Sequence, residues 1–239
     1  MARKGKIKRD RKTIEEVVRP VRWRKYQQIC LIVCEDTKTE PAYFNTFSGA
    51  FPEESFYIRC VGAGKDSLGV VEQALQEVEA LKAEAKKDID FVWVVFDKDD
   101  ADKKEVITQR FDKAFALAAE AKMEVAFSNE VFELWLLLHF QHVPTDKPMP
   151  RKDIYDQLEK AIQGAENDST YSYTHGDDAV IAKVSALGDE NHAITRAKVL
   201  DKKFKGVAPI KANPSTQVYR LVEELREWIA YHNWEPEGK

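Results

Sequence analysis

One run of residues restricts the possible folds more than any other: FVWVVFDKDD, residues 91–100. Its first six residues are all β-branched or aromatic, which is typical of a buried strand, and the apolar run stops at a cluster of carboxylates. In open parallel α/β sheets, ligands bind beyond the carboxyl ends of the strands. Because side chains alternate along an extended segment, we expect Asp97 and Asp99 to point the same way and to converge on one divalent cation. The alternative is a strand that ends in a solvated acidic turn.

Three further apolar runs indicate strands that alternate with helices. The expected strands are ICLIVC, SFYIRCV and MEVAFS, at residues 29–34, 55–61 and 123–128. We expect helices at about residues 67–86 and 103–122, a helix whose N-cap is Thr39, and a helix capped by Ser128 or Asn129. This alternation, which continues to residue 140, predicts an α/β fold: a parallel sheet with helices on both faces.

The chain beyond this point is predicted to be helical. Three prolines between residues 141 and 150 mark a linker or a change of direction. We expect the helices that follow at about residues 152–163, 179–187, 190–205 and 215–232, the last introduced by Pro214 and a capping Ser215. The predicted organisation is therefore a basic arm (1–25), an α/β domain (26–140) and a helical C-terminal region (141–239).

Further acidic residues lie where this topology brings strand ends together. Glu35 directly follows the first strand, and Glu40 lies in the first turn of the helix after it. With Asp97 and Asp99 they should share one edge of the sheet, and Glu133, in an apolar helix, is a possible fifth. Carboxylates without a histidine or cysteine cage suit Mg²⁺ or Mn²⁺. Two alternatives stay open: Glu40 serves only the helix dipole, and Glu133 lies on an exposed helix face.

The charge is divided unevenly between the arm and the rest of the chain. Residues 1–25 hold eleven Lys or Arg and three acids, a formal +8, so a total of −4 leaves −12 elsewhere. A basic arm fits phosphate contacts with a nucleic acid, although a solubilising tail would have the same composition. The residues expected to contact a nucleic acid are Arg22, Arg24, Lys25, Lys65 and Lys98.

The hydropathy pattern excludes membrane classes. No apolar run approaches the roughly 20 residues of a membrane span, and the basic N-terminus lacks the apolar segment of a signal peptide. We expect a cytoplasmic protein without membrane contacts, whose three cysteines are reduced thiols of the core. The sequence leaves the oligomeric state open, and a homo-oligomer is possible.

An acid after the first strand and a DxD after the third resemble the Toprim arrangement of topoisomerases, primases and overcoming-lysogenisation-type nucleases. More closely, four segments in order resemble the RloB family: CEDTKTEPAYF, VFDKDD, SNEVFELWLLLHF and NPSTQVYRLVEEL. The resemblance spans nearly the whole chain. It departs from the family pattern at Asp36, where a glycine is usual, and at Glu130, where proline is common. RloB-like proteins are regarded as Toprim-like nucleases of restriction-linked and phage-defence loci, often encoded beside an ATPase.

The resemblance implies a metal-dependent nuclease of DNA or RNA that acts in antiviral defence, with an ATPase as its partner. On this reading Asp97 and Asp99 are metal ligands, Glu40 binds a second metal, and Glu35 is a ligand or a general acid/base. Glu35, Asp97 and Asp99 are then the catalytic residues. A different class of function is a non-catalytic module of a defence complex that binds nucleic acid or protein.

Overall fold

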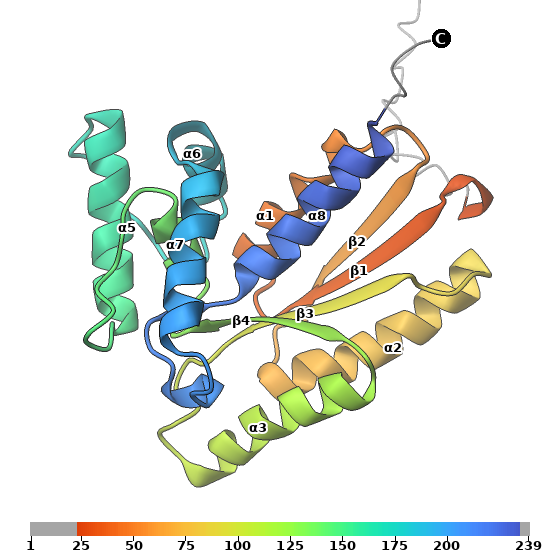
Figure 1. Cartoon of the computed structure of the whole chain (residues 1–239), viewed down its shortest axis with the longest axis horizontal. Coiled ribbons are helices and arrows are strands. Elements are labelled where there is room, and N and C mark those ends of the chain that lie inside the picture. The colour runs from red at the N-terminus through yellow and green to blue at the C-terminus, as the bar shows by residue number, and fades with distance from the viewer. Residues whose placement is uncertain (1–22, 235–239) are drawn as a thin grey trace, which may run out of the picture.

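Residues 23–234 are described by the structure, a computed structural model. Within them, five strands form one sheet in the order β2-β1-β3-β4-β5 (Figure 1). Strands β1 to β4 are parallel to one another, and β5 is antiparallel to β4. The strands are β1 (Gln28–Cys34), β2 (Phe56–Gly62), β3 (Phe91–Asp97), β4 (Glu124–Asn129) and β5 (Ser215–Thr216).

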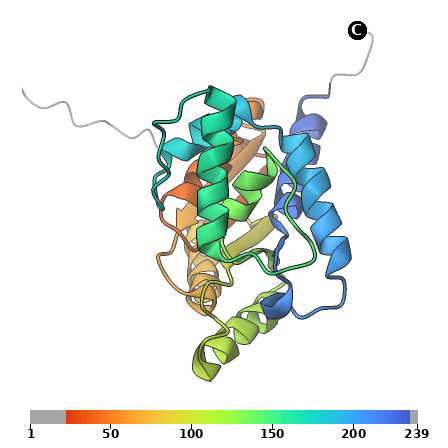
Figure 2. The same ribbon diagram turned by 90° about the vertical axis from the view of Figure 1, so that its left-hand side faces the viewer.

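Helices cover both faces of this sheet (Figure 1). The first face packs on α2 (Ser67–Ala85) and α3 (Glu105–Glu120). The second face packs on α1 (Thr39–Asn45), α4 (Glu133–Leu138) and α8 (Val218–His232). The helices α5 (Arg151–Glu166) and α6 (Ala179–Leu187) pack on α4 and α1, and α7 (Glu190–Lys203) packs on α4, α8 and β5. Figure 2 is seen from the side of α5, with the sheet behind it. Short 3₁₀ turns lie at Trp23–Lys25, Ser48–Ala50 and Pro209–Lys211.

Strand β1 shows why both faces must be covered. Six of its seven residues are buried, and successive side chains alternate between two apolar clusters. Ile29, Leu31 and Val33 join the cluster under α2 and α3. Cys30, Ile32 and Cys34 join the cluster on the other side. Cys30, Cys34 and Cys60 are all free thiols. A strand buried on both faces is typical of a central position in a parallel sheet, which β1 occupies.

The last helix belongs to this core and does not pack separately. On α8, the Trp228 ring lies 4.9 Å from that of Phe91 between centroids, and Glu224 accepts a 2.7 Å hydrogen bond from the Trp93 indole. Residues from the predicted C-terminal region therefore share one apolar cluster with the second face of the sheet.

The predicted α/β fold, with helices on both faces and further helices in the C-terminal region, is confirmed. No helix among residues 23–234 combines the length and the apolar character that crossing a membrane requires. The sheet is not wholly parallel, however, because Ser215 and Thr216 pair with β4. The prediction that Ser215 caps a helix is therefore wrong, and α8 begins at Val218.

Two other predicted caps are also wrong. Thr39 is the first residue of α1 and does not precede it. Its backbone N–H donates a 2.7 Å hydrogen bond to the Asp36 carboxylate, which takes the place of a threonine hydroxyl at the N-terminus of the helix. Ser128 and Asn129 lie within β4, and α4 is a short helix that starts at Glu133. Both N-termini are thus close to acids at the strand ends.

Candidate metal and phosphate site

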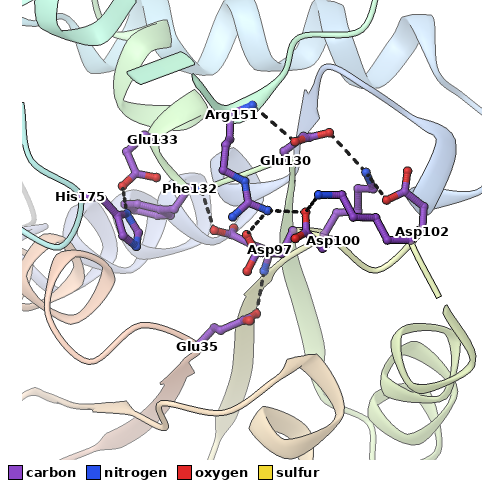
Figure 3. A network of polar contacts seen from close by, with 12 residues as sticks. Glu35, Asp97, Asp100, Asp102, Glu130, Phe132, Glu133, Arg151 and His175 are labelled. Atoms are coloured by element: carbon purple, nitrogen blue, oxygen red, sulfur yellow. Dashed lines mark hydrogen bonds and ion pairs between the residues drawn. The ribbon is translucent and has the colours of Figure 1, made fainter. Parts of the chain in front are cut away.

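Glu35 directly follows β1, which lies between β2 and β3 in the sheet. Its backbone N–H donates 2.9 Å to the carbonyl of Val95, and its own carbonyl accepts 2.9 Å from Gly64. One carboxylate oxygen then accepts a 3.0 Å hydrogen bond from the Asp97 N–H (Figure 3). Burial raises the pKa of Glu35 to about 8. The hydrogen bond from the Asp97 N–H lowers this pKa, and the charge of Asp99 raises it.

Glu40, in the first turn of α1, is buried with 1% of its surface exposed. One carboxylate oxygen accepts a 3.0 Å hydrogen bond from the Asp36 N–H. Burial raises the pKa of Glu40 well above its ordinary value, and the nearby charge of Glu35 raises it further. A dipole effect alone would leave this carboxylate in solvent, and the structure instead places it among other acids.

Asp97 is the last residue of β3, and its two carboxylate oxygens have different surroundings. Oδ2 accepts a 2.8 Å hydrogen bond from the Phe132 N–H, just before α4 (Figure 3). Oδ1 is buried and accepts no hydrogen bond from the described residues. Burial raises the pKa of Asp97 well above its ordinary value, and the charges of Glu40 and Glu35 raise it further. An orphaned buried carboxylate oxygen beside two other acids is a costly arrangement unless a proton or a metal cation joins it.

Asp99 lies near this group, but the predicted reason for its position is wrong. β3 stops at Asp97, so the alternation of an extended strand does not reach Asp99, which has a left-handed φ of 47°. Its carboxylate contacts the Arg151 guanidinium at 3.1 Å. Burial raises the pKa of Asp99, and Arg151 opposes that rise. A turn, and not a continued strand, brings Asp99 to the site.

Glu133 is buried, with 2% of its surface exposed, so the alternative of an exposed helix face is wrong. Its Oε1 accepts a hydrogen bond from the Tyr173 hydroxyl and lies 3.2 Å from Nδ1 of His175. Both partners come from the segment between α5 and α6. The buried carboxyl group of Glu133 therefore has polar partners in that segment, and its role as a fifth metal ligand stays a prediction.

Arg151 is a residue of this site that the sequence did not reveal. It opens α5 and contacts both Asp99 and Asp100, the latter at 3.0 Å (Figure 3). The same side of the molecule has an open cavity of about 590 Å³, lined by Asp99, Arg151, Lys152 and their neighbours. An arginine at the start of a predicted helix carries no local signal, because its partners are some 50 residues away in the sequence.

The expected nucleic-acid contacts are less uniform than the sequence indicated. Lys98 is buried, and its ammonium contacts Asp102 at 3.0 Å and Glu130 at 3.3 Å. Lys65 donates to Gln73 at 2.8 Å, and Lys25 pairs with Glu54 at 2.6 Å. Lys98 is thus paired with two acids that line the same cavity as Asp99 and Arg151. Arg22 and the side chain of Arg24 lie outside the part of the chain that the structure describes.

The acids fit a hard divalent cation by their chemistry. All donors are carboxylate oxygens, and in Glu35, Glu40 and Asp97 one oxygen is held by a backbone N–H while the other accepts no hydrogen bond from residues 23–234. Yet no three acidic, histidine or cysteine side chains of the described chain are arranged closely enough to hold a metal ion as they stand. The donor set suits Mg²⁺ or Mn²⁺, and the side chains would have to draw together around the ion.

Comparison with known proteins identifies a family. No curated protein and no solved structure matches the chain. The family model described as RloB-like protein matches residues 30–225 of the 239, a span that includes every acid of the site described above. The chain therefore belongs to the RloB-like protein family.

Proposed function

We propose that this protein is a divalent-metal-dependent nuclease of the Toprim type, which hydrolyses phosphodiester bonds in DNA or RNA. The observation that carries the proposal is the orphaned Oδ1 of Asp97, buried beside Glu35 and Glu40, whose carboxyl pKa values are also raised. Such a group of acids is unfavourable without a cation and suits one with oxygen ligands.

In this proposal the residues have distinct roles. Asp97, Glu40 and Glu35 would hold Mg²⁺ or Mn²⁺, with Asp99 as a further ligand. A bound divalent cation polarises a scissile phosphate and lowers the pKa of a water nucleophile. Glu35, whose backbone is hydrogen-bonded to the sheet, would also hold or release a proton. Arg151 contacts Asp99 and lines the cavity beside it, and its planar guanidinium would suit a phosphate there.

The experiment is a cleavage assay on the full chain. Labelled plasmid, single-stranded DNA and total tRNA are each incubated with Mg²⁺, with Mn²⁺ or with EDTA. We expect cleavage of at least one substrate with metal and none with EDTA. Binding without cleavage of any substrate would contradict the proposal and favour the non-catalytic binding module.

The biological setting is proposed from the family resemblance alone. We infer a role in antiviral defence together with a partner ATPase. The test compares phage plating on cells that carry the wild-type chain or its Asp97→Asn variant, each with and without the ATPase. Protection that survives Asp97→Asn would separate the defence role from the acidic site.

A further inference from the structure

Aromatic rings lie next to the acids on the C-terminal side of the molecule. Tyr155, on α5, stacks on His175 with centroids 5.6 Å apart and an angle of 26° between the planes. Tyr173 adds a third ring, 5.5 Å from Tyr155. Tyr173 and His175 belong to the segment 167–178, which joins α5 to α6. We call Tyr155, Tyr173 and His175 the aromatic group.

Hydrogen bonds fix this loop against the rest of the protein. The Tyr173 hydroxyl and Nδ1 of His175 both contact the buried carboxylate of Glu133. The Tyr173 backbone N–H donates 2.8 Å to Glu159 on α5, and the Gln163 amide donates 2.7 Å to the carbonyl of Tyr171. The rings are therefore held in place before any ligand arrives.

One ring of the group is open to solvent. The His175 side chain is 65% exposed although it stacks on Tyr155 and contacts Glu133. A ring supported on one side and exposed on the other is the geometry on which a further flat group can stack.

The open ring is also close to the proposed phosphate site. Arg151 lies four residues before Tyr155, one turn earlier on α5, and contacts Asp99. His175 contacts Glu133 at 3.2 Å, and this hydrogen bond is the main cause of its raised pKa, to which the charges of nearby Asp36 and Asp99 add. Figure 3 shows His175 beside Glu133, in the same group of side chains as Arg151 and Asp97.

We propose that His175, supported by Tyr155, stacks on an unpaired nucleobase next to the phosphate that Arg151 contacts. The site then takes single-stranded or locally unpaired nucleic acid, because the bases of an intact duplex offer their faces only to each other. This inference rests on the proposed function for the class of its ligand, and it adds what that function leaves open, the strand state of the substrate.

The test measures binding and not cleavage. Full-length protein with Asp97→Asn is titrated, in Mg²⁺, against three fluorescein-labelled probes by fluorescence anisotropy. The probes are a single-stranded oligonucleotide, the duplex of the same sequence, and the same strand with its central residues abasic. The abasic strand keeps every phosphate and loses only the bases. We expect the complete single strand to bind most tightly.

Two variants at one position separate the ring from its hydrogen bond. His175→Gln keeps a donor for Glu133 and loses the ring, whereas His175→Phe keeps a ring and loses the donor. We expect His175→Gln to weaken binding of the complete strand about tenfold and to leave the abasic strand unchanged. His175→Phe should stay within about threefold of the parent. Melting temperatures check that both variants are folded.

Three outcomes would overturn the inference. These are equal affinity of the parent for the complete and abasic strands, a preference for the duplex, or equal losses in His175→Gln and His175→Phe. The proposed function is tested separately by wild-type cleavage. Absence of cleavage together with ring-dependent binding would overturn the proposed nuclease and keep the base contact. Cleavage together with binding that does not depend on the His175 ring would overturn the base contact and keep the nuclease.

Discussion

Asp97 is the single side chain whose surroundings conflict most with a negative charge. Its Oδ1 is buried without a hydrogen bond from the described residues, and Glu40 and Glu35 add repulsion. In the metal-free protein a neutral amide at this position would remove that repulsion. Stability alone does not account for a residue that disfavours its own ionised state, and such residues are common at functional sites.

The first prediction is that Asp97→Asn combined with Asp99→Asn abolishes metal-dependent cleavage and leaves the melting temperature in EDTA unchanged or higher. An asparagine at position 97 keeps an oxygen that can still accept from the Phe132 N–H, so the fold loses little. Cleavage assays and thermal unfolding check the two parts. Asp112→Asn, an exposed substitution on α3, is the matched control and should change neither.

The second prediction concerns pH. The pKa of Glu35 is raised from 4.5 to about 8, so the folded state holds a proton that the unfolded state has released. The contribution of this group is complete below pH 4.5 and is lost as the pH rises to about 8. In EDTA we therefore expect the free energy of unfolding to fall by a few kcal/mol across that range.

Urea unfolding at a series of pH values measures this effect. Glu35→Gln should flatten the profile, and added Mg²⁺ should stabilise the wild type more at about pH 8.5 than at about pH 6, because protons and metal compete for the same carboxylates. If the free energy of unfolding of the wild type in EDTA does not fall between pH 4.5 and about 8, the raised pKa of Glu35 is contradicted.

At the scale of elements, the end of β2 supports the loop that carries the acids. A Cβ on Gly62 would lie 2.5 Å from the Asp36 carbonyl oxygen and 2.4 Å from the Thr37 Cα. Both are backbone atoms of the loop between β1 and α1, which cannot move without displacing Glu35 or Glu40. Close approach of two backbones is the reason for a glycine at this position.

The third prediction follows from that contact. Gly62→Ala should lower the free energy of unfolding by about 1–3 kcal/mol and reduce cleavage at a fixed metal concentration, because the loop must shift. Gly164→Ala is the matched control: a Cβ there meets nothing within 4 Å, and alanine in α5 should stabilise by about 0.5–1 kcal/mol. Equal stability changes in the two variants would contradict the steric argument.

The elements differ in how far local sequence determines them. β1 and β3 could be predicted because their β-branched and aromatic runs suit only a buried strand, and the acids after them follow from the direction of parallel strands. β5 could not, because a two-residue strand has no period and depends on pairing with β4.

Contacts between distant segments were equally out of reach. The turn at Asp99 breaks an alternation that the DxD pattern seemed to continue. The hydrogen bonds of Glu133 come from Tyr173 and His175, about 40 residues later in the chain. Periodicity reports on neighbours in the sequence, so it found the acids and missed Arg151 and the aromatic group that surround them.

At the scale of the whole molecule, the basic arm and the acidic body have opposite charges. Most of the arm, residues 1–22, lies outside the described part of the chain. The residues that follow it are attached to the body: Trp23 packs edge-on against Tyr57 at 4.7 Å, and Lys25 pairs with Glu54. A deletion that tests the arm should therefore end before Trp23.

The fourth prediction is that deletion of residues 1–22 weakens nucleic-acid binding and flattens its salt dependence. The deleted segment contains nine Lys or Arg, and each phosphate contact that is lost reduces the slope of log affinity against log salt by about one. Binding isotherms at several salt concentrations measure that slope. An unchanged slope would identify the arm as a tail without phosphate contacts.

The pairing of β5 with β4 and the cover that α8 gives to Phe91 and Trp93 have a consequence for biosynthesis. Both elements follow β1 to β4 in the chain, so they leave the ribosome after those strands. Until they emerge, a nascent chain that already contains β1 to β4 carries an unpaired strand edge and an apolar sheet face exposed to water. We expect such a chain to be a client for chaperones and to close its core only after β5 and α8 have emerged.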